Sequence, residues 1–370
     1  MFVKSLTLTN YRNYERQKIN FSEGLNVFWG DNAQGKTNIV EAIYCASLGH
    51  SHRTRQDTEL IKWEKEAGRI ALDYARSGVA GKVELTFAQN KRRQISLNSH
   101  PISLKDLIGN LNTVLFSPED LFLIKGAPGE RRRFLDREIS QASPVYYHEL
   151  IKYNRLIKER NALLKGIRER NTRPQMLDVW DPQVASSAAA IVQKRQATIT
   201  QLNRLAAKIG KIISGDMENL RLEYEITGLS EKMTLEPEKW YNEKLAQGRE
   251  TDIIRATTGI GPHRDDLIIK VNEVNLKTYG SQGQQRTGAL ALKLAELEFL
   301  HEATGEYPIL LLDDVMSELD RDRRRELMSF IEKENIQTMI TATDAAYFPE
   351  GLKARFFKVK QGAVEEKPAE

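Results

Sequence analysis

Eight residues near the start of the sequence have the types and spacing of a loop that binds phosphate groups. They are Gly30-Asp31-Asn32-Ala33-Gln34-Gly35-Lys36-Thr37, which fit the pattern G-x-x-x-x-G-K-[ST] at every fixed position. Glycines let backbone N–H groups turn inward around phosphates, and Lys36 is expected to reach the β- and γ-phosphates of a nucleotide. The Thr37 hydroxyl is expected to ligate Mg²⁺. Asn38, the next residue, is also expected to contact the nucleotide. The sequence therefore predicts an ATP and Mg²⁺ site here.

Two carboxylates far along the chain could complete this site. Asp313 and Asp314 directly follow the apolar run Ile309–Leu312, which predicts a strand buried on both faces. Ligands of layered α/β folds bind where such strands end. We expect Asp313 to contact Mg²⁺, directly or through water, and Asp314 to orient or polarise the attacking water. The alternative interpretation of residues 309–314 is an ordinary strand followed by a polar turn. The presence of a phosphate loop in the same chain favours the metal site over this alternative.

A third motif lies between these two. Ser281-Gln282-Gly283-Gln284-Gln285-Arg286 resembles the signature of ABC ATPases, S-x-G-Q-x-R in their DNA-repair members. In that family the signature caps the γ-phosphate held by a second subunit, so the resemblance implies an ATP-dependent homodimer. Ser281, Gly283 and Gln284 would form this cap with the start of the next helix. Ser317 to Asp320 resembles the D-loop, which crosses between subunits, with Ser317 and Asp320 as its contacts.

Strands and helices alternate around these motifs, which predicts a layered α/β fold. The segments expected as strands are 2–9, 25–29, 69–75, 82–87, 93–97, 267–271, 308–312 and 336–342. Strands 82–87 and 93–97 are expected to pair across Gln89-Asn90, and a hairpin is expected around Gln361-Gly362. Helices are expected over 36–48 and 289–300, with a loop over Gly280–Gln285.

The middle of the chain has a different, helical pattern. Apolar residues recur at spacings of three, four or seven in two stretches, which predicts two long helices packed against each other. The residues are Tyr146, Leu150, Tyr153, Ile157, Leu164 and Ile167, then Val184, Ala188, Ile191, Thr198, Leu202, Leu205, Ile209 and Ile212. Asn171–Pro182 is expected to be the tip of this hairpin. Together with the resemblance of the motifs to those of ABC ATPases, this pattern implies an ABC-type P-loop ATPase head, lobe I, at residues 1–115 and 251–370, with an inserted helical lobe II at 116–250.

The overall composition is that of a globular protein without a membrane span. The 370 residues carry a net charge of +4, and no apolar run approaches the ~20 residues that cross a bilayer. The first ten residues lack the pattern of a signal peptide. The single cysteine, Cys45, excludes an internal disulfide and is expected to be a small core residue. These features predict a cytoplasmic protein with no membrane partner.

Basic residues are concentrated in one region. Arg131–Arg173 contains twelve Lys or Arg against five Asp or Glu, whereas the whole chain is nearly neutral. A solvated surface is the simple explanation, but contacts with the phosphates of DNA need such a surface. The predicted DNA-binding residues are Arg131, Arg132, Arg133, Lys152, Lys158 and Lys165, with Arg160, Arg168, Lys91-Arg92-Arg93 and Arg323-Arg324-Arg325 as further candidates.

Five segments resemble one family, the bacterial RecF recombination proteins. They are Asn10–Tyr14 (NYRNY), Ser51–Thr54 (SHRT), Ser117–Leu121 (SPEDL), Gly126–Asp136 (GAPGERRRFLD) and Gly261–Leu267 (GPHRDDL). The resemblance extends over the full chain and implies an ABC-type head without the long coiled coil of its Rad50 and SMC relatives. It implies binding of ATP, Mg²⁺ and gapped, double- or single-stranded DNA, and cooperation with RecR and RecO in loading RecA at gaps. By analogy with Rad50-like heads, Arg12 would lie near the nucleotide, or else be a surface arginine.

The sequence departs from transporter motors in ways that bear on turnover. The run Thr338–Thr343 has no histidine, so Thr341 or Thr343 must sense the γ-phosphate. Asp314 stands where transporters usually have Glu, and its shorter side chain suits weak ATP hydrolysis. For a chain that resembles RecF, we expect this ATPase activity to be stimulated by DNA and to act as a switch. His263 and Arg264 either brace the catalytic face or cap the strand after them. The competing functions are an ATP-gated DNA clamp with negligible hydrolysis, the motor subunit of another ABC system, and a metabolic P-loop kinase.

Overall fold

The strand that precedes the phosphate loop lies inside a six-stranded, largely parallel sheet. The computed structural model describes residues 1–215, 217–229, 236–348 and 351–367. In spatial order the strands are β15 (Ala363–Glu366), β14 (Ala354–Lys360), β3 (Leu25–Trp29), β13 (Thr338–Ala342), β12 (Ile309–Asp313) and β8 (Thr113–Phe116). All neighbouring pairs are parallel except β14 with β15. The carboxyl ends of β3 and β12 therefore lie at one edge, which brings the phosphate loop close to Asp313.

A second six-stranded sheet is antiparallel. Its strands, in spatial order, are β2 (Tyr14–Asn20), β1 (Phe2–Tyr11), β4 (Ala67–Arg76), β5 (Val79–Ala88), β6 (Gln94–Leu97) and β7 (His100–Pro101). β5 and β6 pair as predicted. The sequence did not reveal β2 or β8, whose short runs lack a clear alternation of apolar residues.

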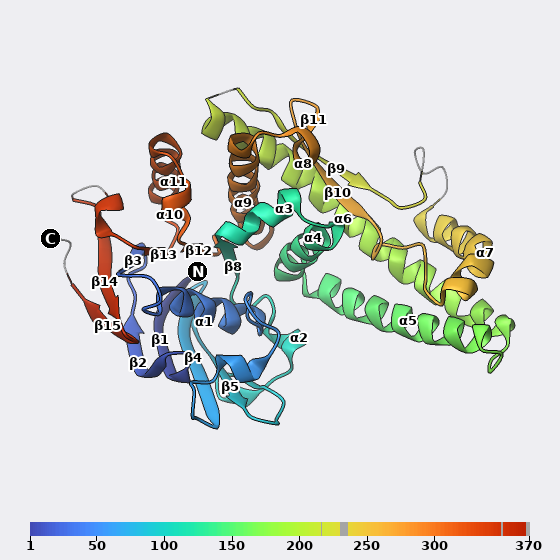
Figure 1. Ribbon diagram of the computed structural model, residues 1–370, viewed down its shortest axis with the longest axis horizontal. Helices are drawn as coiled ribbons and strands as arrows, with labels where there is room; N and C mark the ends of the chain where they lie inside the picture. Colours follow the sequence, from blue (N-terminus) through green and yellow to red (C-terminus); the bar gives the residue numbers. More distant parts are fainter. Residues whose placement is uncertain (216, 230–235, 349–350, 368–370) are drawn as a thin grey trace. The chain divides into compact units, whose positions relative to one another are not determined.

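Helix α1 (Lys36–Leu48) packs against strands of both sheets (Figure 1). Eleven of its thirteen residues are buried, including Cys45 as predicted. A helix that is buried on nearly all sides has no polar face. One continuous apolar core results, in which Phe28 of β3, Ile39 and Ile43 of α1, and Leu311 of β12 take part. This core fixes the start of α1, where the phosphate loop ends.

The chain divides into two units. One consists of Met1–Asp120 and Lys293–Glu370, and the other of Leu121–Leu292. The first boundary is near the predicted one, whereas the second lies at Leu292 and not at 250. The reason is that β9 (Leu220–Glu225) pairs with β10 (Asp266–Val271), so residues 251–292 belong to the inserted unit.

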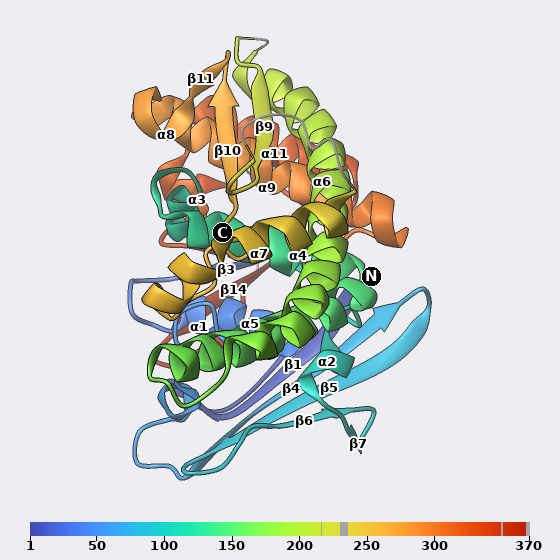
Figure 2. The ribbon, with the colours of Figure 1, turned by 90° about the vertical axis from the view of Figure 1, so that its right-hand side faces the viewer.

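Helices dominate the inserted unit. They are α3 (Leu121–Lys125), α4 (Pro128–Ala142), α5 (Pro144–Arg168), α6 (Leu177–Ser214), α7 (Pro237–Arg255), α8 (Leu276–Tyr279) and the first part of α9 (Gln282–Thr304). Strands β9, β10 and β11 (Val274–Asn275) form a small sheet, and β9 packs along α6 (Figure 2). The remaining helices, α2 (Leu104–Leu107), α10 (Val315–Glu318) and α11 (Arg321–Lys333), belong to the first unit.

The predicted pair of long helices is present as α5 and α6, which pack against each other. The predicted tip is too long, because α6 begins at Leu177 and continues through Pro182. Tertiary contacts keep this turn helical despite the proline: Leu177 is fully buried, and the Asp181 carboxylate binds Arg160 and Arg249. Ile212, predicted on the contact face, is 56% exposed.

Buried polar contacts join the helices of the inserted unit. The fully buried Arg160 of α5 donates to Asp181 of α6 at 2.8 Å and to Asp252 of α7 at 2.7 Å. Arg195 of α6 donates to Asp136 of α4 at 2.7 Å and to the carbonyl of Pro262 at 2.6 Å. Removing one partner from such a pair leaves a charge buried without compensation. None of the helices in the described ranges has an apolar stretch of the length that a membrane span requires.

Candidate nucleotide site

The phosphate loop connects β3 to α1 and has the backbone that its glycines allow. Gly30 has φ +142°, and a Cβ there would lie 2.5 Å from the carbonyl oxygen of Val359. Gly35 has φ +117°, and a Cβ there would lie 2.6 Å from the side chain of Asn13. Side chains rarely adopt such φ values, so both positions need glycine. The two glycines of the predicted phosphate-binding motif are thus also required by the backbone conformation and by close packing.

Lys36 folds back over the loop. Its Nζ donates to the carbonyl oxygens of Gly30 at 2.5 Å and Asp31 at 2.7 Å. Burial lowers the pKa of Lys36, and the carboxylates of Asp314 and Asp313 act against that shift. The ammonium group is therefore held at the mouth of the loop, where phosphate oxygens would be in reach.

The loop is held from two sides through Gln34. The Asn13 side chain, in the turn between β1 and β2, donates to the Gln34 carbonyl at 2.8 Å. In the turn between β14 and β15, the backbone N–H of Gln361 donates to the Gln34 side chain at 2.7 Å, and that of Gly362 to the Gln34 carbonyl at 3.2 Å. These contacts restrict the loop before any ligand binds. No motif in the sequence predicts these contacts.

Asp313 and Thr37 come together as predicted. The Thr37 hydroxyl donates to Oδ1 of Asp313 at 2.9 Å, and the Thr341 hydroxyl donates to the same oxygen at 2.7 Å. Burial raises the pKa of Asp313, and these two hydrogen bonds partly oppose the increase. No three His, Cys, Asp or Glu residues cluster as metal ligands in the described parts of the chain. A hydroxyl beside one carboxylate, completed by phosphate oxygens and water, fits the oxygen ligands that Mg²⁺ takes.

Asp314 has an unusual backbone for its residue type. Its φ is +54°, it directly precedes α10 as the N-cap residue, and its N–H donates to the Thr341 hydroxyl at 2.9 Å. Its Oδ1 is buried and accepts no hydrogen bond from a described residue. Such an oxygen is unusual, because most buried polar atoms have a hydrogen-bond partner. The Thr341 hydroxyl is already held between Asp313 and Asp314, whereas Thr343 lies just past the end of β13 and is half-buried.

A buried carboxylate that the sequence did not point to organises the start of α1. Arg12 (φ +51°) donates to both oxygens of Glu41, at 2.8 and 2.6 Å. Ser51 donates to Glu41 at 2.5 Å, and Arg53 donates to Asn38 at 2.9 Å. Arg12 is thus adjacent to the phosphate loop through its neighbour Asn13, but its guanidinium is occupied by Glu41. The positive charge of Arg53 opposes the increase that burial causes in the pKa of Asp313. Arg53 therefore adds positive charge near the site.

The signature residues belong to the inserted unit, and α9 begins there at Gln282, seven residues before the predicted start. The Ser281 hydroxyl accepts from the N–H of Gln284 at 3.2 Å, and the Gln284 side chain accepts from the N–H of Ser281 at 3.0 Å. This reciprocal pair is a capping box, which the S-x-x-Q spacing could have revealed. Gly283 is exposed, and a Cβ there would meet only Ser281. The exposed helix start is therefore well defined.

The two D-loop candidates have local partners in the first unit. The Ser317 hydroxyl donates to the carbonyl of Asp314 at 2.8 Å. Asp320 caps α11 by accepting from the N–H of Arg323 at 2.9 Å, and this hydrogen bond lowers the pKa of Asp320. Of the nearby basic cluster, Arg323 and Arg325 form ion pairs on α11, with Asp320 and Asp322.

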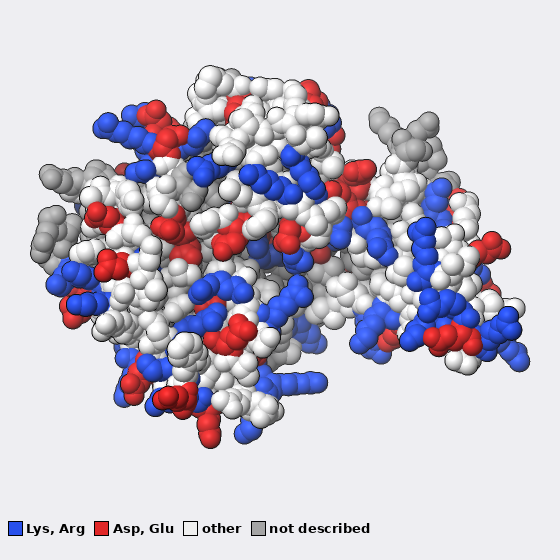
Figure 3. All heavy atoms as spheres, viewed as in Figure 1, with Lys and Arg blue, Asp and Glu red and all other residues white. Residues whose placement is uncertain are grey.

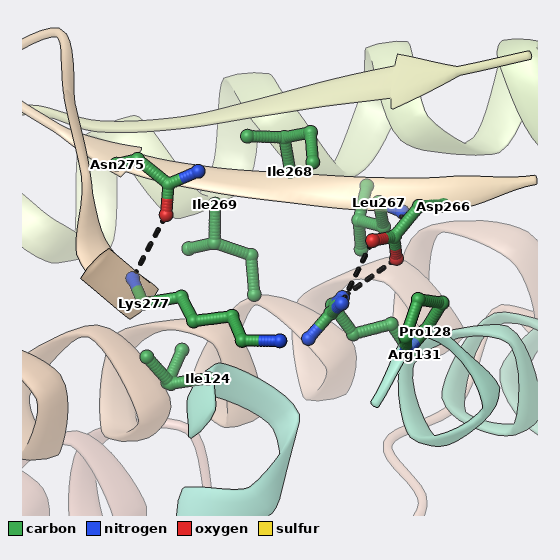
Figure 4. A pocket seen from close by; sticks show the side chains of 9 residues that line it. All are labelled: Ile124, Pro128, Arg131, Asp266, Leu267, Ile268, Ile269, Asn275 and Lys277. Atoms are coloured by element: carbon green, nitrogen blue, oxygen red, sulfur yellow. Dashed lines mark hydrogen bonds and ion pairs between the residues drawn. The ribbon is translucent and has the colours of Figure 1, made fainter. Parts of the chain in front are cut away.

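Arg131 is not available for DNA, so that prediction is wrong. It is 4% exposed, and its guanidinium donates to both oxygens of Asp266 at 2.7 Å. The pair lines a cavity of about 90 Å³ along β10, which Lys277 also lines, beside Ile124 (Figure 4). Arg132 donates to the carbonyl of Asp265 at 2.7 Å, and exposed Arg133 pairs with Glu130.

The basic residues of α5 differ from one another. Arg160, a further candidate, is fully buried, and its prediction as a DNA contact is wrong. Lys152, Lys158 and Lys165 are exposed; Lys152 lies 3.2 Å from Glu149 and Lys165 lies 3.9 Å from Glu169. Helix α5 carries six Lys or Arg residues against two Glu, and Lys and Arg side chains predominate over it in Figure 3. In the other cluster, Arg93 binds Asp57, while Lys91 and Arg92 are exposed.

His263 has a structural role inside the inserted unit. Its Nδ1 lies 2.6 Å from the Tyr153 hydroxyl, and its Nε2 lies 3.1 Å from the carbonyl oxygen of Thr258. Arg264 donates to the same carbonyl at 3.0 Å. His263 thus ties the loop before β10 to α5, and Arg264 ties this loop to itself, so neither predicted role describes them fully.

Comparison with known proteins agrees with this geometry. The family model described as "RecF/RecN/SMC N terminal domain" matches residues 2–365. A protein of Ruminiclostridium cellulolyticum named "DNA replication and repair protein RecF" is 43% identical, with 98% of this chain and 99% of the relative covered. Its namesake in an Exiguobacterium species is 44% identical, with 99% of each chain covered.

Solved structures show the same fold. The recombination mediator RecF with ATP, described as part of the RecFOR pathway, is 35% identical with a TM-score of 0.91, covering 99% of this chain and 98% of that one. An Smc head domain of Pyrococcus furiosus is 16% identical with a TM-score of 0.58, covering 99% and 96%. The latter likeness supports the fold alone. The chain has the fold of an ABC-type ATPase head, and it belongs to the RecF family.

Proposed function

We propose that this protein is an ATP-dependent DNA-binding protein of recombinational repair and replication-fork maintenance. ATP binds at the phosphate loop with Mg²⁺, two copies associate around the nucleotides, and slow hydrolysis returns them to single copies. As the ATP-bound dimer, the protein helps RecR and RecO to load RecA at single-strand gaps in the cytoplasm. The RecF relatives, one of them solved with ATP, support the repair role.

One observation carries the nucleotide part of the proposal. The Thr37 hydroxyl and the Asp313 carboxylate, 276 residues apart in sequence, lie 2.9 Å from each other at the end of the parallel sheet. A P-loop ATPase needs these two groups together, because they hold Mg²⁺ against the β- and γ-phosphates. The ion, when bound, would neutralise charge that develops on the phosphate oxygens.

The side chains of this chain then divide the remaining work. Lys36 binds the β- and γ-phosphates, Asp314 accepts a proton from the attacking water, and Thr343 contacts the γ-phosphate. Thr343 is preferred to Thr341, because the Thr341 hydroxyl already bonds to Asp313 and Asp314. Aspartate in place of a longer glutamate positions water less well, which favours slow turnover.

The second copy completes the site. The capped helix start at Ser281, Gly283 and Gln284 offers backbone N–H groups and a partial positive charge to an anion. Each nucleotide would lie between one copy's phosphate loop and the other copy's signature, with Ser317 and Asp320 at the contact. Exposed Lys152, Lys158, Lys165 and Arg133, with half-buried Arg132, would meet DNA phosphates.

The test is the oligomeric state in solution. Size-exclusion chromatography with light scattering would compare the wild type, Lys36→Ala, Ser281→Arg and Asp314→Asn, with and without ATP and Mg²⁺. We expect the wild type to dimerise only with ATP, Lys36→Ala and Ser281→Arg to stay monomeric, and Asp314→Asn to remain dimeric longer. If all four stay monomeric with ATP bound, the segment 281–286 does not act as a signature.

A phosphate-release assay on the same proteins separates the proposal from a clamp without hydrolysis. Asp314 is the proposed base, and no described residue occupies its Oδ1. Release that Asp314→Asn abolishes supports slow ATPase activity. ATP-dependent dimers that release no phosphate, even with DNA present, would make the protein an ATP-gated DNA clamp.

A further inference from the structure

The side chain of Trp63 is 91% exposed, the largest value among the exposed large apolar side chains of the described residues. A tryptophan carries a large apolar surface and a flat aromatic face, and full exposure to water is unfavourable for both. It lies at the tip of a tight turn, closed by the N–H of Lys65, which donates to the carbonyl of Lys62 at 3.1 Å. Glu64, next to it, has φ +64°. The turn therefore presents the indole ring to solvent.

This turn is fixed directly beside the phosphate loop. Ile61 forms a β-bridge with Tyr11 at the end of β1. The Lys62 Nζ donates to the carbonyl of Asn13 at 3.2 Å, and the Asn13 side chain donates to the Gln34 carbonyl at 2.8 Å. Two hydrogen bonds thus connect the residue next to Trp63 with the loop that binds phosphates. A nucleotide whose phosphates are bound at residues 30–37 would extend its base over the surface next to this loop, where the turn with Trp63 lies.

We propose that Trp63 is the stacking platform for the base of the nucleotide bound at the phosphate loop. This inference rests on the proposed function, since it needs a nucleotide there. A base offers a flat aromatic face of about the size of the indole ring, and such stacking contributes similarly for all bases. Trp63 would therefore add affinity without selecting strongly between adenine and guanine.

An unpaired base of DNA is the other source of the same chemistry, and the local charges disfavour it. Within the turn, Lys62 and Lys65 are matched by Glu64 and Glu66. Binding of a DNA strand depends on an excess of positive charge that follows its backbone. The base of a nucleotide needs no such excess, because its phosphates are neutralised at Lys36.

Calorimetric titrations with ADP and with inorganic pyrophosphate, each with Mg²⁺, isolate the contribution of the base. ADP avoids both hydrolysis and the ATP-linked dimer. We expect Trp63→Ala to weaken ADP binding about tenfold and to leave pyrophosphate binding unchanged. Trp63→Phe should recover most of the loss, and GDP should show the same pattern as ADP. Val79→Ala, which truncates another exposed apolar residue, is the matched control and should change neither.

Each other outcome has a defined meaning. Unchanged ADP binding in Trp63→Ala overturns the proposal. In that case the variant is tested with a single-stranded oligonucleotide and with an abasic one. Weaker binding of the first and normal binding of the second would mean that the ring stacks on a base of DNA instead. Equal loss of ADP and pyrophosphate affinity also overturns it, because the turn would then only support the phosphate loop. If the wild type binds neither ligand, the proposed function itself fails, independently of Trp63.

Discussion

The Arg12 guanidinium forms two hydrogen bonds, of 2.6 and 2.8 Å, with the fully buried carboxylate of Glu41, five residues after Lys36. Burial alone would raise the pKa of Glu41, but the hydrogen bonds from Arg12 and Ser51 outweigh it and hold that pKa below its ordinary value. The pair fixes the turn between β1 and β2 against the helix that follows the phosphate loop.

Arg12→Ala should therefore destabilise the protein, because it leaves a buried carboxylate without its main partner. We expect a loss of ~3 kcal/mol in the free energy of unfolding, measured by chemical denaturation. The double variant Arg12→Ala with Glu41→Leu is the control and should recover much of the loss. A single variant as stable as the wild type would mean that water compensates Glu41.

Two buried groups of the inserted unit should respond to pH in opposite directions. Burial raises the pKa of Asp265 to about 6, although the N–H of Thr227 and the Tyr224 hydroxyl donate to it. Burial lowers the pKa of His263 to about 4, against the hydrogen bond to Thr258. The stability that Asp265 contributes is present below its unfolded pKa and is lost as pH rises to about 6. The contribution of His263 is present above its unfolded pKa of 6.5 and is lost as pH falls to about 4.

The two contributions nearly cancel in the wild type between these pH values, so removing one group should reveal the other. Unfolding of His263→Gln should become easier by ~3 kcal/mol as pH rises from about 4 to about 6. Asp265→Asn should show a change of similar size in the opposite direction. Denaturant titrations across this range measure both slopes, and parallel profiles for the two variants would contradict the assignment.

Arg160 should matter for stability, whereas Lys158, two residues before it, should not. Arg160→Ala leaves Asp181 and Asp252 buried with one partner fewer, and we expect a loss of ~3 kcal/mol or more. Lys158→Glu changes an exposed side chain and should stay within ~0.5 kcal/mol of the wild type. Comparing the two midpoints in guanidinium chloride tests this contrast, and similar midpoints would count against a buried network.

Exposed lysines of α5 should act through DNA phosphates. Reversing both Lys158 and Lys165 to Glu should weaken DNA binding and lower the slope of log affinity against log salt by ~1.8, at ~0.9 per contact. Fluorescence anisotropy with a gapped duplex at several salt concentrations measures both quantities. Lys105→Glu with Lys353→Glu, two exposed lysines of the other unit, is the charge-matched control. An unchanged slope in the α5 variant would remove this helix from the DNA surface.

What the sequence revealed was local. Helix α1 begins and ends where its pattern predicts, and Asp313 lies beside Thr37, because a strand end and a loop can each be recognised from a few adjacent residues. Arg131 and Arg160 were misread because charge counts do not show partners. Their carboxylates, Asp266 and Asp252, lie 135 and 92 residues away in sequence.

Other features depend on packing that no short pattern encodes. The turn at Gln361 and Gly362 was predicted as a hairpin, but its contacts with Gln34 could not be. Glu41 lies among the apolar residues of α1, and only the fold supplies Arg12 as its partner. Pro182 predicts a helix break, and buried neighbours override that preference.

The sheet order has a consequence for how the protein is made. Among the described strands, β3 pairs with β13 and β14 alone, which are about three hundred residues further along the chain. Contacts between such distant segments form late, because the entropy of closing a long loop is lost before the pairing compensates for it. During synthesis, the phosphate loop leaves the ribosome early but stays without its neighbouring strands until residues 338–360 have followed. A nascent or prematurely terminated chain would therefore lack a formed nucleotide site.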